Sequence, residues 1–205
     1  MFLINKYDLL FTISIFVALL PFRVSGEVVD VEQDWKSGWS VTGFNGWFTD
    51  DATITQTLKF EKDLDSSYRF AGVALNKRFL TLWSRLEVEG EFQILKHYGS
   101  QHQGEFVGLA ALRWRTFPWD RWLQTGFAVG AGISVATEEP EYELKNKGET
   151  SQVLAYLLFE GELGLRRFPR WTVVGRIHHR SAAFDFFTDS HASSNAYALG
   201  LKFRF

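Results

Sequence analysis

The feature that most constrains the fold is a strict two-residue alternation of apolar and charged side chains. Between 153 and 165 every odd position is apolar or glycine, whereas the even positions include Glu160 and Glu162. The same split occurs in 82–94 and in 104–115. This period is typical of strands with one apolar and one polar face, and a barrel in a membrane requires it on every strand.

A further segment, 121–135, places large apolar residues on one face and the small residues Gly126, Ala128, Gly130 and Gly132 on the other. We expect these small residues to face the lumen and to leave room there for long charged neighbours. The other predicted strands are 38–48, 67–77, 171–182 and 194–205, the first two with weaker alternation. The sequence therefore predicts an all-β fold, an eight-stranded antiparallel transmembrane β-barrel.

The polar face carries equal numbers of carboxylates and guanidiniums. Because an unpaired buried charge is very costly, we expect them to pair and to give a filled polar lumen, so that a small-solute channel is the weakest functional hypothesis. The predicted inward groups are Glu87, Glu89, Glu91, Glu105, Glu160 and Glu162 with Arg85, Arg113, Arg115, Arg166, Arg176 and Arg180.

The N-terminal residues read as an export signal. Lys6 precedes an apolar run over 9–20, and small residues precede Glu27. The run is too short for a membrane helix, so we predict a signal peptide over 1–26 and the barrel over 27–205. A helical N-terminal anchor is the alternative.

Composition agrees with a barrel that is exported to a membrane. The net charge of −2 gives no field that would attract nucleic acid, and the absence of cysteine excludes disulfides and thiolate metal sites. Of 205 residues, 34 are Phe, Trp or Tyr. Aromatic residues at this density suit the belts that such barrels place at the two membrane interfaces.

The connections give the expected orientation. Short turns alternate with longer loops, and bacterial outer-membrane barrels have short periplasmic turns, so both termini are expected in the periplasm. The last alternating segment ends in Phe205, which resembles the signal that the outer-membrane barrel assembly machinery reads. We therefore expect the outer membrane of a Gram-negative bacterium as the location, with outer-membrane lipid and that machinery as partners.

One segment near the outward end of the seventh strand carries residues for nucleophilic chemistry. By alternation His179 and Ser181 share the lipid-facing side, whereas His178 and Arg180 face the lumen. Residues two apart on one strand face have Cβ atoms roughly 6–7 Å apart, so the imidazole can reach the hydroxyl. It can then accept the hydroxyl proton as the serine attacks an ester.

The strand count, the export signal, the final Phe and above all His179-Arg180-Ser181 resemble the lipid A deacylase family. These small outer-membrane barrels remove an ester-linked 3-hydroxyacyl chain from lipopolysaccharide with a lipid-facing Ser/His/Glu triad. The resemblance implies lipid A as partner, Ser181 and His179 as catalytic residues, and no metal or cofactor. Asn195 stands where the family has its glutamate, and Ala182 where it has an asparagine. Further segments resemble uncharacterised barrels often grouped with that family: 101–106, 112–114, 117–119 and 193–196.

Three points remain open at this stage. Asp185 or Asp189 could replace the missing glutamate, and Arg180, Lys145 or Lys147 could contact lipid A phosphates. The alternative function is a non-catalytic structural or adhesive barrel that acts through outward loops such as the acidic Thr137–Glu143. No metal site is predicted, although all five histidines fall near the outward end, because their spacing matches no metal motif.

Overall fold

Eight antiparallel strands form a closed barrel, in which β1 pairs with β8. The computed structural model describes residues 37–83, 85–115, 117–120, 122–182 and 192–205. The strands are β1 (Trp39–Thr49), β2 (Leu64–Leu82), β3 (Leu86–Gly99), β4 (Gly104–Trp114), β5 (Leu123–Ala136), β6 (Val153–Leu165), β7 (Trp171–Ser181) and β8 (Ser193–Arg204). The predicted eight-stranded barrel is confirmed. The predicted signal over 1–26 lies outside the described residues.

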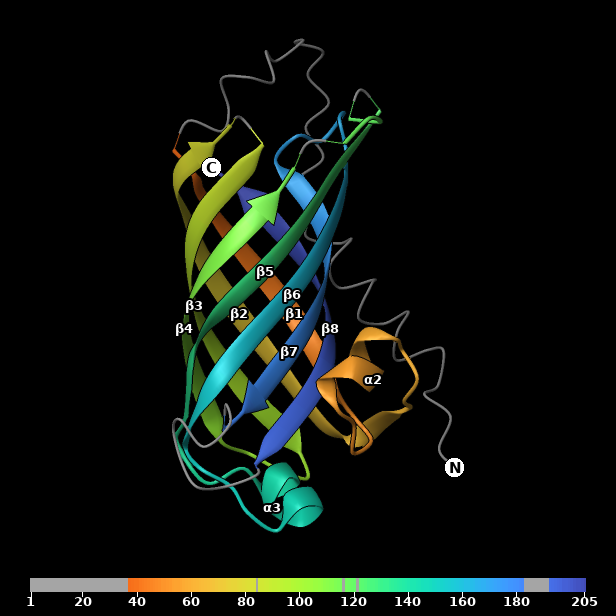
Figure 1. Cartoon of the computed structure of the whole chain (residues 1–205), viewed down its shortest axis with the longest axis vertical. Coiled ribbons are helices and arrows are strands. Elements are labelled where there is room, and N and C mark those ends of the chain that lie inside the picture. Colours follow the sequence, from red (N-terminus) through yellow and green to blue (C-terminus); the bar gives the residue numbers. More distant parts are fainter. Residues whose placement is uncertain (1–36, 84, 116, 121, 183–191) are drawn as a thin grey trace.

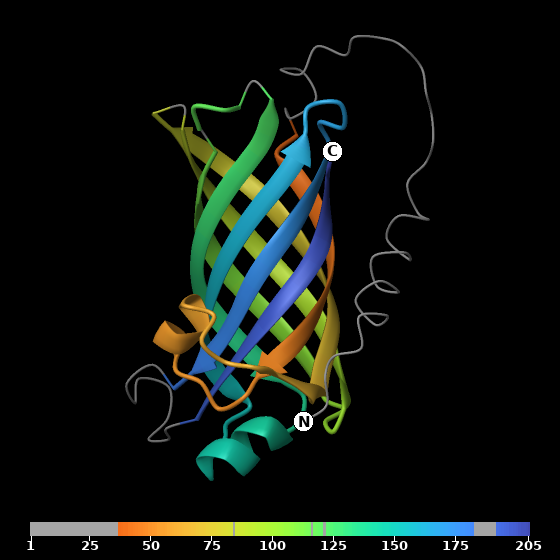
Figure 2. The ribbon, with the colours of Figure 1, turned by 90° about the vertical axis from the view of Figure 1, so that its right-hand side faces the viewer.

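The two ends of the barrel have different connections. At the short-turn end lie the connections 83–85, 115–122 and 166–170 together with the C-terminal end of β8 (Figure 1). At the long-loop end, helix α3 (Glu141–Lys147) lies across the opening, and helix α2 (Ile54–Leu58) lies outside the wall (Figures 1 and 2). No helix among the described residues is long and apolar enough to cross a membrane.

Side chains alternate between the lumen and the outer surface as the sequence predicts. On β6, Glu160 is fully buried whereas Leu163 is 53% exposed. Ile94 on β3 and Phe127 on β5 are likewise about half exposed on the outside, at 53% and 48%. An apolar outer wall around a charged interior is the reverse of a water-soluble barrel, and it is what a lipid environment requires.

Ion pairs fill the half of the lumen nearer the short-turn end. Glu160 lies at their centre, 2.8 Å from Arg113 and 2.7 Å from Arg176, and it also pairs with Lys202. Arg113 reaches on to Glu89 at 2.9 Å. Loss of one partner from such a buried group leaves an uncompensated charge, so the network holds five strands in place. The predicted filled lumen is confirmed.

Aromatic rings fill the other half of the lumen. Phe48 contacts Phe70 and Tyr142, with ring centroids 5.8 and 4.7 Å apart, and Tyr68 packs edge-on against Tyr142 at 5.2 Å. Each of these side chains is at most 5% exposed. They join α3 to the barrel interior, so the long-loop end is closed by packed side chains.

Of the small lumen residues of β5, Gly126 makes room for a charge as predicted, whereas Gly130 and Gly132 lie against Leu109. A Cβ atom built on Gly126 would lie 2.5 Å from Glu162 Oε1. Any side chain at this position would therefore displace Glu162 from its ion pairs with Arg113 and Arg204, at 3.3 and 2.6 Å.

Two predicted lumen residues are wrong. Arg85 and Arg166 lie in turns at the short-turn end and are exposed, because β3 begins only at Leu86 and β6 ends at Leu165. Their places in the ionic network are taken by Lys202 and Arg204 of β8, which are 1% and 4% exposed.

The turn between β2 and β3 also lies later than expected from the predicted strands 67–77 and 82–94. Strand β2 continues to Leu82 because a bulge between Arg78 and Leu80 takes up one extra residue and lets pairing resume. The chain then reverses through Trp83, whose φ is +49°.

Candidate functional site

The strand register brings His179 and Asn195 together on the outer wall. They are directly paired residues of β7 and β8. His179 Nδ1 lies 2.9 Å from Asn195 Oδ1. The carboxamide thus occupies the position in which a Ser/His/Glu site would hold its carboxylate.

The hydrogen bonds of Asn195 determine which ring nitrogen of His179 carries the hydrogen. The Asn195 amide nitrogen donates to the carbonyl of Ala52 at 2.6 Å, so its oxygen must be the atom that faces the imidazole. An amide oxygen only accepts hydrogen bonds, and Nδ1 must therefore carry the hydrogen. In a neutral ring the lone pair is then on Nε2, which is the atom that a general base uses.

Ser181 lies two residues further along the same face and is partly exposed, opposite Ser193. No hydrogen bond joins its hydroxyl to His179 in the part of the chain that the structure describes. A bond of this kind is often formed only when substrate is bound. Ala182 is 5% exposed and has no side-chain donor for an oxyanion. Asp185 and Asp189 lie outside the described residues.

The connection 50–63 between β1 and β2 covers this part of the outer wall. On β7, the outward residues Val173 and Gly175 are exposed, whereas Ile177 and His179 are only 8% and 6% exposed. Helix α2 contacts β7 and β8 there (Figure 1). The prediction that His179 faces outward is right in direction, but its side chain meets a covering segment.

Local sequence explains why the covering segment is ordered. Thr53 caps α2, accepting from the Gln56 amide at 3.3 Å while Gln56 Oε1 accepts from the Thr53 amide at 3.1 Å. On β8, the Tyr197 hydroxyl donates to the Thr57 carbonyl at 2.6 Å, and Phe60 stacks on the Tyr197 ring at 5.1 Å. Two neutral hydrogen bonds and one ring contact therefore fasten the segment to the wall.

Across the same wall, the lumen side of β7 serves a structural purpose. Arg180 is 1% exposed and lies 3.1 Å from Glu143 of α3, which agrees with its predicted place in the network at the lumen mouth. It is therefore not available to lipid A phosphates, contrary to one of our expectations. Lys147 pairs with Asp51 at 2.5 Å, whereas Lys145 is exposed and its ammonium lies 5.4 Å from the centre of the Tyr68 ring.

Two of the histidines pair with a carboxylate inside the barrel, and His191 lies outside the described residues. His97 and His178 both contact Glu105 inside the barrel, at 2.8 and 3.2 Å. Within the ranges that the structure describes, no group of three or more His, Cys, Asp or Glu side chains could hold a metal ion. The only partner that His179 itself makes with a side chain there is the neutral Asn195.

Comparison of sequences finds no matching family and no similar curated protein. Solved structures do match. The outer membrane enzyme PagL has 13% identity and a TM-score of 0.50, with 81% of this chain and 99% of PagL covered. This chain has the fold of the eight-stranded outer-membrane barrels. Neisserial surface protein A (NspA) matches with 10% identity and the same TM-score of 0.50, over 82% of this chain and 98% of NspA. An enzyme and a surface protein thus match the outer-membrane barrel equally well, and the activity must be argued from its residues.

Sequence reasoning identified His179, Ser181 and Asn195 but missed Ala52. A backbone carbonyl has no sequence signal, and Ala52 reaches the site only because the connection 50–63 folds back onto the wall. Its contact is the one that orients the Asn195 amide.

Proposed function

We propose that this chain is an outer-membrane serine esterase of the lipid A 3-O-deacylase type. Ser181 is the nucleophile, His179 the general base and Asn195 the group that orients His179. The contact that carries the proposal is the 2.9 Å hydrogen bond from His179 Nδ1 to Asn195 Oδ1, which leaves Nε2 available to the serine. Its place on the outer wall at the long-loop end supports lipopolysaccharide of the outer leaflet as the partner.

The proposed reaction has two steps. As Ser181 Oγ bonds to the ester carbonyl carbon, His179 Nε2 takes the hydroxyl proton; the ester C–O bond then breaks and the proton passes to the sugar oxygen. A water molecule next attacks the acyl-serine, His179 again transfers the proton, and a 3-hydroxy fatty acid leaves. Asn195 holds the ring but lacks the charge that stabilises an imidazolium, so we expect slower turnover than a glutamate would give.

The substrate has to displace the covering segment. His179 is 6% exposed beneath the connection 50–63, so an acyl chain reaches it only when α2 moves off the wall. The contacts to be released are two neutral hydrogen bonds, each worth about 1 kcal/mol, and the partly exposed ion pair of Asp51 with Lys147, worth about 1 kcal/mol or less. Substrate binding can supply a free energy of this size. Exposed Leu58 and Phe60 on this segment, 41% and 73% exposed, face the lipid from which the substrate comes.

The decisive test is mass spectrometry of the lipid A from vesicles that contain the purified chain and lipopolysaccharide. Mass spectra should show loss of one 3-hydroxyacyl group with the native chain. Ser181→Ala should lower its release by about 10³-fold or more, because the nucleophile is absent.

Ser193→Ala is the matched control, since Ser193 is the cross-strand partner of Ser181 on the same face. It should keep the native rate. Both variants are first checked for folding by far-UV circular dichroism. Lipid A that stays intact with the native chain, or equal rates for Ser181→Ala and native chain, would contradict the proposal.

The alternative is a non-catalytic structural or adhesive barrel. Two observations favour it: the candidate base is covered, and the surface protein NspA matches as well as the enzyme PagL does. In that case His179→Ala and Ser181→Ala are both silent, whereas shortening of the long loops alters surface binding.

A further inference from the structure

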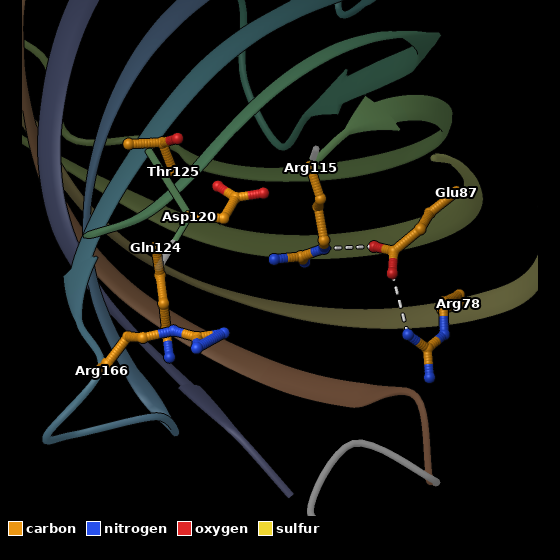
Figure 3. A pocket seen from close by; sticks show the side chains of 7 residues that line it. All are labelled: Arg78, Glu87, Arg115, Asp120, Gln124, Thr125 and Arg166. Atoms are coloured by element: carbon orange, nitrogen blue, oxygen red, sulfur yellow. Dashed lines mark hydrogen bonds and ion pairs between the residues drawn. The ribbon is translucent and has the colours of Figure 1, made fainter. Parts of the chain in front are cut away.

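A cavity of about 250 Å³ opens at the short-turn end, far from His179 and independent of the proposed esterase. Seven residues line it, from the ends of β2 to β6: Arg78, Glu87, Arg115, Asp120, Gln124, Thr125 and Arg166 (Figure 3). Three guanidiniums face two carboxylates, so its lining has an excess of positive charge. This end is expected to face the periplasm.

On one side of the cavity, the charged side chains already pair with one another and with other residues of the barrel. Glu87 accepts from Arg78 at 2.8 Å and also from Arg115 (Figure 3). Arg115 also donates to Glu162 deeper in the lumen. These contacts continue into the ionic network. Arg78 and Arg115 therefore have fixed positions, and this side forms a rigid wall.

On the opposite side, several polar atoms have no hydrogen-bond partner within the described part of the chain. Both side-chain polar atoms of Gln124 are buried without a hydrogen-bond partner, and so is Asp120 Oδ1, although Asp120 Oδ2 accepts from the Phe117 amide at 2.8 Å. Arg166 is exposed in the turn after β6, also lines the cavity (Figure 3), and makes no ion pair or hydrogen bond with any described residue. Buried polar atoms are normally paired, so the unpaired buried atoms of Gln124 and Asp120 around a cavity point to a ligand.

We propose that this cavity binds the carboxyl terminus of a short peptide. A carboxylate matches the bidentate geometry of Arg166. A peptide group offers one acceptor and one donor, which is what the unpaired nitrogen and oxygen of Gln124 require. Asp120 Oδ1 then accepts from a further N–H. The volume is below that of sites for drug-sized molecules, which limits the occupant to a small ligand or to the end of a longer chain.

The test is calorimetric titration of the full chain in detergent micelles with three probes: alanyl-alanine, its C-terminal amide, and inorganic phosphate. Alanyl-alanine should bind, and the amide about tenfold more weakly because it cannot pair with Arg166. Arg166→Gln should weaken binding of alanyl-alanine by a similar factor.

Arg167→Gln is the matched control, because it removes the same charge from the same turn but Arg167 does not line the cavity. It should leave binding unchanged. Gln124→Leu gives a second readout: it should weaken binding without lowering the unfolding midpoint, since no bond within the described chain is lost.

Four results would each overturn the proposal. They are no binding of alanyl-alanine, equal affinity for its amide, equal affinity for phosphate, and equal effects of Arg166→Gln and Arg167→Gln. Equal effects of the two arginine variants would show that the peptide is attracted by the general positive charge of this turn and not bound in the cavity.

Discussion

The two faces of the β7–β8 pair each hold a loop of the long-loop end, but they do so with different chemistry. On the lumen side, the inner cluster joins α3 to the wall: Glu143 lies 3.1 Å from Arg180 and accepts from Ser194 at 2.8 Å. On the lipid side, the outer cluster joins the connection 50–63 to Asn195 and Tyr197. The inner cluster is ionic and the outer one is neutral.

The hydroxyl of Tyr142 adds to the inner cluster. It donates to the Thr49 carbonyl, and burial together with the nearby charges of Asp51, Asp65 and Asp50 raises the pKa of Tyr142 above its ordinary value. The phenol therefore keeps its proton and this bond through the neutral and moderately alkaline range.

This difference separates a permanent contact from one that can open. Glu143 is fully buried, and removal of one member of a buried ion pair leaves the other charge without compensation. The outer hydrogen bonds each contribute only about 1 kcal/mol. We infer that α3 closes the lumen as part of the fold, whereas the connection 50–63 is the part that moves.

The largest effect is expected from Glu143→Ala. It deprives Arg180 and Ser194 of their acceptor, and Arg180 keeps, among the described residues, Glu105 at 3.8 Å and two backbone carbonyls. The free energy of unfolding should fall by about 3 kcal/mol, measured by denaturant unfolding in lipid vesicles.

Glu141→Ala is the control for this variant, since Glu141 lies in the same helix but is exposed. Its effect should stay within about 0.5 kcal/mol. Similar losses in the two variants would remove the distinction between the inner cluster and an ordinary surface helix.

A smaller effect is expected from Asn195→Asp in the outer cluster. A carboxylate cannot donate to the Ala52 carbonyl and repels it, so the connection 50–63 should open about tenfold more often, a change of about 1.4 kcal/mol. Hydrogen exchange should rise in 50–63 and stay unchanged in α3. The proposed esterase should also turn over faster, because a carboxylate stabilises the imidazolium.

Asn45→Asp, on the outer face of β1, makes the same chemical change away from the cluster and should not alter exchange in 50–63. Unchanged exchange in Asn195→Asp would show that Ala52 is held by something other than the amide.

The barrel could be predicted because its constraint is periodic. Alternation fixed which face Glu89, Glu160 and Arg113 occupy, and the structure confirms all three in the lumen. Alternation failed at the ends of strands, because a two-residue period does not say where strand pairing stops. Arg85 and Arg166 continue the alternation of their strands but lie in turns. Lys202 and Arg204 alternate with the outward residues Leu201 and Phe203, so the sequence pattern also indicates that they face inward.

The site could be predicted only in part. The two-residue alternation predicted that His179 and Ser181 lie on the outer face. The β7–β8 register brings Asn195 next to His179. What covers the pair was not predictable, because the fold of 50–63 depends on contacts with Tyr197 and Asn195, which are distant in sequence. For the same reason Glu143, expected in an exposed acidic loop, is instead fully buried in the lumen mouth.

The smallest effect is expected from Tyr197→Phe, which divides the outer cluster into its two kinds of contact. The variant loses the hydroxyl bond to the Thr57 carbonyl but keeps the ring that stacks on Phe60. We expect exchange in 54–58 to rise by a factor of about two to five, which corresponds to about 0.5–1 kcal/mol, with no change in global unfolding. Tyr98→Phe, on the outer face of β3, is the control and should leave 54–58 unaffected. A loss of global stability in Tyr197→Phe as large as that in Glu143→Ala would mean that the outer contact is as permanent as the inner one, and access to His179 by movement of α2 would then be ruled out.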